Sequence, residues 1–140
     1  MNFTEKMVAM TVATLLADGK TEQEELETIK QVAADMELDA AEVEACIAKE
    51  LAKPTPMEKV AQAIRKKEDA KNILEACELV ALADKYLDHN EINLMLHLAD
   101  LLKIEPSKVV LDIATITQND RSILIEGNIT LHGDDEIIIP

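Results

Sequence analysis

The stretch LLADGKTEQEELETIKQVAADMEL, at residues 15–38, has a second copy in ALADKYLDHNEINLMLHLADLLKI, at residues 81–104, 66 positions later and without a gap. Apolar residues exchange conservatively between the copies, as Ile29 does with Met95, and they recur at the spacing of one helix face. Acidic residues also recur, which the packing of an apolar face does not require. The repeat therefore predicts two copies of one helical unit that carry the same carboxylates.

The composition favours a helical fold with an aliphatic core. Apolar residues make up 48% of the chain, yet it has one Tyr, one Phe and no Trp, and only three glycines and four prolines interrupt it. At 140 residues the chain can form one domain with a substantial core. We predict an all-α domain of about seven helices over residues 1–118, with three-helix repeats at about 4–52 and 69–117 joined by a linker helix at 56–67.

Polar and turn residues mark the ends of these predicted helices. Gly19 can adopt the left-handed conformation that ends a helix over residues 4–18. The second-copy helix is predicted to run through Asp84. Four of the following helices begin after a residue that can accept hydrogen bonds from their first amides. These predicted caps are Thr21, Asp39, Thr55 and Asp88.

The C-terminal segment, residues 119–140, changes from a helical to a strand pattern. Residues 122–126 and 129–132 flank a Gly127-Asn128 pair, which is typical of a two-residue hairpin turn. A lone hairpin is marginally stable in water, so this one is expected to dock on the helices or to pair with another chain. The apolar run at 137–139 makes homodimerisation through the C-terminal strands a hypothesis.

The formal net charge of -14 restricts the partners of this chain. Nucleic acids and anionic membranes would repel it, whereas cations and basic proteins would not, and solubility alone is a sufficient explanation of the charge. No apolar run reaches the roughly 18 residues of a membrane-spanning helix. Residues 1–6 lack a basic segment followed by an apolar one, so no signal peptide is expected. Cys46 and Cys77 fit buried thiols of a reducing cytoplasm.

The central segment, residues 53–71, departs from this acidic background. It holds six basic and three acidic residues, which gives it a charge of 6 − 3 = +3. Two interpretations remain open: the segment is a solvated connector, or it is the face that attracts an acidic partner.

The repeated carboxylates are the candidate metal ligands. In each copy an acid near the end of one helix lies seven residues before an acid near the start of the next, and oxygen-rich clusters of this kind suit calcium, magnesium or manganese. The alternative is that these acids cap helices and bond loop backbone. The candidate ligands are Asp18, Glu25, Asp84 and Glu91, with Glu22 and Asp88 as additional ones. The histidines show no metal-binding spacing and no phosphate-binding glycine motif is present, so no enzyme activity is expected.

The run from Leu16 through Asp18-Gly19 to Glu25, with its apolar-periodic continuation to Leu38, resembles the tellurite-resistance TerB-like family. The second copy, from Ala81 through Asp84 and Glu91 to Ile104, resembles it as well, although Lys85 stands where the first copy has glycine. The resemblance covers roughly residues 4–117. It implies an all-helical, internally pseudo-symmetric fold and a cytoplasmic protein of tellurite or chemical stress response that chelates metal through acidic residues. Members also occur as modules of co-chaperones, so the resemblance leaves a metal-free protein-interaction adaptor as the alternative.

Overall fold

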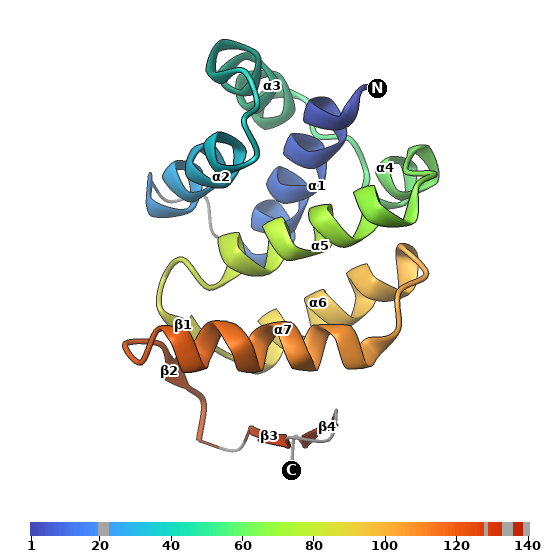
Figure 1. Ribbon diagram of the computed structural model, residues 1–140. Coiled ribbons are helices and arrows are strands. Elements are labelled where there is room, and N and C mark those ends of the chain that lie inside the picture. The colour runs from blue at the N-terminus through green and yellow to red at the C-terminus, as the bar shows by residue number, and fades with distance from the viewer. Residues whose placement is uncertain (20–22, 128, 133–135, 139–140) are drawn as a thin grey trace.

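The computed structural model describes residues 1–19, 23–127, 129–132 and 136–138, and it confirms the helical class (Figure 1). Within these residues the chain forms seven helices: α1 (Phe3–Asp18), α2 (Gln23–Asp35), α3 (Ala40–Ala52), α4 (Met57–Ala63), α5 (Lys67–Ala81), α6 (His89–Leu101) and α7 (Pro106–Asn119). Four short strands accompany them: β1 (Tyr86–Leu87), β2 (Leu124–Ile125), β3 (Thr130–His132) and β4 (Glu136–Ile138).

Helix α1 lies at the centre of the N-terminal half. It contacts α2, α3, α4, α5 and α6, and Figure 1 shows α5 passing between α1 and the pair formed by α6 and α7. A helix surrounded by others must be apolar on most of its surface. The sequence of α1 meets this requirement, because every residue from Met7 to Val12 is buried. Thr11 and Thr14, which are polar, donate their hydroxyl hydrogen bonds to backbone carbonyls one turn earlier.

The core is aliphatic, as the composition predicts. It continues from α1 through Ile29, Ile73 and Leu98 to Ile113, all of them no more than 1% exposed. Cys77 is fully buried and Cys46 is half-buried, and both are free thiols. Burial raises the pKa of both thiols, that of Cys77 to about 12.

The two copies repeat the same backbone turns. Left-handed φ angles occur at Gly19 (74°) and at its equivalent Lys85 (64°), and again at Glu37 (61°) and at its equivalent Lys103 (58°). The prediction that the second-copy helix runs through Asp84 is wrong, since α5 ends at Ala81. The amide of Lys85 donates to the carbonyl of Leu82 at 3.0 Å, so the second copy turns where the first does but without glycine.

Several helix starts follow the predicted caps. Asp39 accepts a hydrogen bond from the amide of Glu42, and Asp88 forms a capping box with Glu91. The predicted cap at Thr55 is wrong, because Pro56 precedes α4 and no side-chain hydrogen bond caps that helix. The linker helix is also shorter than predicted and spans Met57–Ala63. Thr21 and Glu22 lie outside the described residues.

A C-terminal hairpin is present, but its strands differ from the predicted pair. β3 and β4 are antiparallel, whereas β2 pairs in parallel with β1, from the loop before α6. β4 contacts α7, which matches the expectation that the hairpin docks on the helices. Homodimerisation through these strands and a domain boundary near residue 118 stay predictions.

Candidate functional site

The first acidic corner lies where α1 ends and α2 begins. Asp18 is the last residue of α1, and Gly19 follows in the left-handed conformation with its amide directed to the carbonyls of Leu15 and Leu16. Glu25 lies in the first turn of α2 and is fully buried. The dipole of a helix disfavours a carboxylate at its C-terminal end and favours one at its N-terminal end, so Asp18 is in the less favourable setting. Glu22 lies outside the described residues.

The second acidic corner lies between α5 and α6. Asp84 Oδ1 accepts a hydrogen bond from the amide of Tyr86 at 3.1 Å. Asp88 and Glu91 cap α6 reciprocally: Asp88 Oδ1 accepts from the Glu91 amide at 2.8 Å, and Glu91 Oε1 accepts from the Asp88 amide at 3.3 Å. Glu91, the equivalent of Glu25, is 1% exposed. The structure thus brings Asp88 and Glu91 together, and it assigns both a role in starting the helix.

The candidate ligands do not form a ready cation cage within the described residues. No group of three or more His, Cys, Asp or Glu side chains in that part of the chain is arranged to hold a metal ion. Asp18, Glu25, Asp84 and Glu91 each take part in a polar or electrostatic interaction. Their donor atoms, however, are all carboxylate oxygens, which is the chemistry that hard divalent cations require.

The chain matches the family model described as Tellurite resistance protein TerB over residues 4–111. It belongs to the TerB family. The TerB match includes both acidic corners and ends inside α7, before β2, β3 and β4 begin. Comparison with curated proteins and with solved structures found no significant match. Among the described helices, none combines the length and apolar character needed to cross a bilayer.

Residues beyond the TerB match add polar contacts at the second corner that the sequence analysis missed. Glu126 Oε2 accepts a hydrogen bond from the amide of His89 at 2.9 Å, which adds a second carboxylate to the start of α6. Lys85 forms an ion pair with Asp120, and this pairing holds the pKa of Asp120 down at about 2. Neither contact has a local sequence signal, because both join residues at least 35 positions apart.

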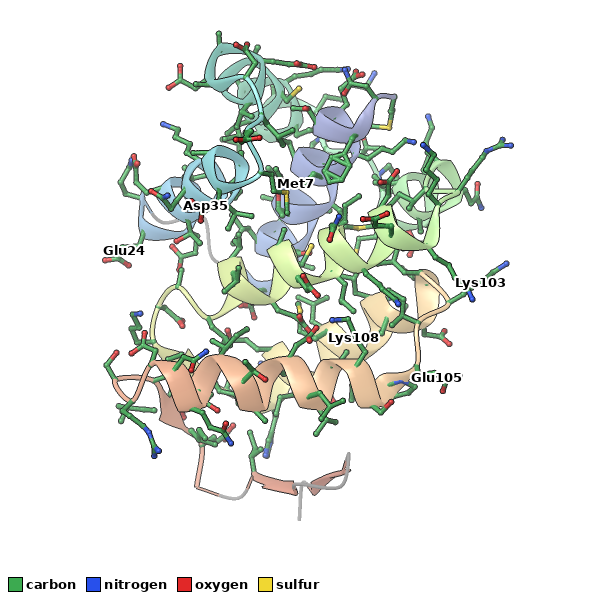
Figure 2. The ribbon with its side chains drawn as sticks, in the orientation of Figure 1. Met7, Glu24, Asp35, Lys103, Glu105 and Lys108 are labelled. Atoms are coloured by element: carbon green, nitrogen blue, oxygen red, sulfur yellow. The ribbon has the colours of Figure 1, made fainter. Side chains whose placement is uncertain are left out.

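A partly buried charge cluster between α5 and α7 was also missed. Lys108 Nζ lies 2.6 Å from Glu75 Oε1 and 2.8 Å from Asp112 Oδ1, and Figure 2 shows the labelled lysine between the two helices. Glu78 is 1% exposed beside this group. Burial, with the neighbouring Asp112, raises the pKa of Glu78 to about 10. One signal was available: Glu78 falls on the apolar stripe of α5, four residues after the buried Leu74.

Proposed function

We propose that this TerB-family chain is a non-catalytic cytoplasmic domain that binds a divalent cation through its repeated acidic corners and serves resistance to tellurite or related chemical stress. Membership of the TerB family supports the link to tellurite resistance. The observation that supports cation binding is a buried carboxylate at the same position of both copies. Glu25 is 0% exposed, and its equivalent Glu91 is 1% exposed. Core packing would favour an apolar residue at such a position.

The energetics of buried carboxylates favour a cation in addition to the interactions that these groups already make. Removing a carboxylate from water costs several kcal/mol unless an opposite charge or hydrogen-bond donors offset it. Two like charges about 4 Å apart also repel by about 4 kcal/mol at an effective dielectric constant near 20. A divalent cation offsets both costs, and in this proposal Asp18 with Glu25, and Asp84 with Glu91, hold it through carboxylate oxygens.

The test is calorimetric titration of the metal-free protein with calcium, magnesium and manganese, together with thermal unfolding. A bound cation stabilises the folded state by about 2.7 kcal/mol at a concentration of 100 times Kd, which raises Tm measurably. Asp18→Asn and Asp84→Asn should weaken binding. Asp35→Asn is the matched control, because Asp35 also ends a helix, α2, but is exposed and is not a candidate ligand.

Asp18→Asn and Asp84→Asn also distinguish one shared cation site from two separate cation sites. If all four carboxylates share one cation, Asp18→Asn and Asp84→Asn each abolish the whole binding heat. If each corner binds its own cation, each variant removes one of the two binding events. Absence of heat and of a Tm shift with all three cations would refute the proposal.

A further inference from the structure

A groove of about 820 Å³ lies where the end of α4 and the start of α5 meet the turn between α6 and α7. Figure 2 shows Lys103 on this side of the molecule, at the turn that follows α6. Four of the residues that line the groove are basic, and Glu58 is its one acidic lining residue among those described. We call this surface the basic groove and define it by Arg65, Lys66, Lys67 and Lys103, with Ile64 and Leu101 as its apolar part.

The four cations of the basic groove lack local partners. All are exposed, and within the described residues none lies within 4.0 Å of a carboxylate oxygen. Lys30, Lys85 and Lys108, which do form ion pairs with acids of this chain, all lie outside the groove. Acidic residues outnumber basic ones by 28 to 14, so a groove lined by four basic residues and one acidic residue departs from the average. Such a surface attracts negative charge.

The positive surface continues beyond the groove. A second hollow of about 590 Å³ shares Arg65 and Lys66 with the basic groove and adds Lys6, with Asp69 as its acidic member. The cations are therefore spread along a surface, as an extended ligand requires, and are not gathered around one point.

The short range of electrostatic forces in salt solution favours one kind of ligand for the basic groove. The Debye length is about 8 Å at physiological ionic strength, so a short segment in the groove responds mainly to the nearby cations. A nucleic acid or an anionic bilayer extends far beyond the groove and meets the rest of a chain whose net charge is -14. A short acidic ligand therefore fits this surface better than an anionic polymer or a membrane does.

The apolar part of the groove adds a second requirement. Ile64 and Leu101 are half-buried, and Leu102, which also lines the groove, is 9% exposed, so the groove offers apolar contact beside its cations. A small inorganic anion would not use that contact, whereas a peptide with acidic and apolar side chains would use both.

We propose that the basic groove is a docking surface for a short acidic segment of another protein, whose carboxylates pair with Arg65, Lys66, Lys67 and Lys103 and whose apolar side chains contact Ile64 and Leu101. This interaction is independent of the acidic corners, which lie at the other ends of α1 and α5.

The experiment is fluorescence anisotropy of the full chain with a labelled peptide of repeated Asp-Glu-Leu units. The matched peptide has Asn-Gln-Leu units. Arg65→Glu combined with Lys103→Glu reverses two groove charges, and Lys53→Glu combined with Arg121→Glu is the control, because it changes the net charge equally at exposed sites outside the groove. Circular dichroism checks that both variants fold, and Arg65→Gln with Lys103→Gln repeats the test by removing charge without reversing it.

We expect the acidic peptide to bind the natural chain and the control, and the groove variant to bind it at least about tenfold more weakly, since each lost attraction becomes a repulsion. Added salt should weaken the binding. The proposal is overturned if the acidic peptide does not bind, if the amide peptide binds equally well, or if groove and control variants lose affinity equally. Tighter binding of a single-stranded DNA or of phosphatidylserine vesicles than of the acidic peptide also overturns it.

Discussion

Replacing Glu78 by Gln should stabilise the folded protein at neutral pH. The carboxyl group of Glu78 is buried between α5 and α7 beside the carboxylate of Asp112, whose hydrogen bond favours the protonated form of Glu78. Lys108, the neighbouring cation in the described part of the chain, already bonds Glu75 and Asp112. With burial and the negative charge of Asp112 both opposing ionisation, the pKa of Glu78 rises from 4.5 to about 10, so the folded state keeps this acid protonated.

The sign and the size of the effect follow from proton linkage. Between pH 4.5 and about 10 the folded state holds a proton on Glu78 that the unfolded chain has released. The stability associated with this group is therefore fully present below pH 4.5 and is lost as the pH rises toward 10. One pH unit corresponds to about 1.36 kcal/mol, so the loss at pH 7 is about 3 kcal/mol. Gln has the same shape as protonated Glu and does not ionise, so Glu78→Gln should avoid this loss.

Urea unfolding across the range from about pH 5 to about pH 8 measures the effect. The difference in unfolding free energy between Glu78→Gln and the natural chain should grow with pH and reach about 3 kcal/mol near neutrality. Glu68→Gln is the control on the same helix: Glu68 is exposed in the first turn of α5, and its removal should cost no more than a few tenths of a kcal/mol at any pH. If the unfolding free energies of the natural chain and of Glu78→Gln change with pH in parallel, the reasoning is refuted.

Two further predictions concern the turns of the repeat. Glu37 is exposed with φ at 61°, a conformation that costs a residue with a Cβ atom about 1 kcal/mol, so Glu37→Gly should raise the urea midpoint. The control Glu44→Gly, in the interior of α3, should lower it by a similar amount. At the second corner, Lys85→Ala should move the pKa of Asp120 from about 2 up toward its usual 3.8, which an NMR titration of the carboxyl carbon detects. An unchanged Asp120 titration would show that the lysine does not set this pKa.

The regular helices could be predicted from the sequence because their signals are local. The apolar spacing in the repeat and the capping box of Asp88 with Glu91 connect residues three or four positions apart, and the structure confirms both. The turn at Lys85 could not be predicted in this way. Its backbone carbonyl accepts a hydrogen bond from the Leu124 amide at 2.8 Å, and its side chain pairs with Asp120, so distant residues hold a left-handed turn that lacks glycine.

The strand pairing at the C-terminus was misjudged for the same physical reason. The Gly127-Asn128 pair is a local signal for a hairpin, but residues 124–125 have a competing partner in β1. That partner is presented by the turn after α5, which the sequence analysis placed inside a helix. One wrong helix boundary therefore produced the wrong partner for β2.

The buried acidic residues differ in how far the sequence predicts the contacts around them. One carboxylate oxygen of Glu91 accepts a hydrogen bond from the amide of Asp88, three residues away, which accounts for the place of Glu91 at the start of α6. Glu50, 3% exposed, accepts hydrogen bonds from the amide and the hydroxyl of Thr55 at 2.8 and 2.9 Å, and this contact displaces the cap predicted for Thr55. The cluster around Glu78 depends on two helices whose facing residues lie more than 30 positions apart. The burial of an acidic residue can thus be predicted where its hydrogen-bond partner is close in the sequence. It cannot be predicted where tertiary packing brings the partner from another helix.

The placement of basic residues relative to carboxylates differs between these acidic sites and the basic groove. An acidic chain gains most from a lysine placed where carboxylates are crowded, as Lys108 is between Glu75 and Asp112. The cations of the basic groove make no such contribution, because no carboxylate within the described residues lies close enough to pair with them. Neighbouring like charges repel by about 1 kcal/mol at about 4 Å even in water, so gathering them has an energetic cost. A cost of this kind is offset when a ligand of opposite charge binds, which is why the groove is better explained as a docking surface than as a connector.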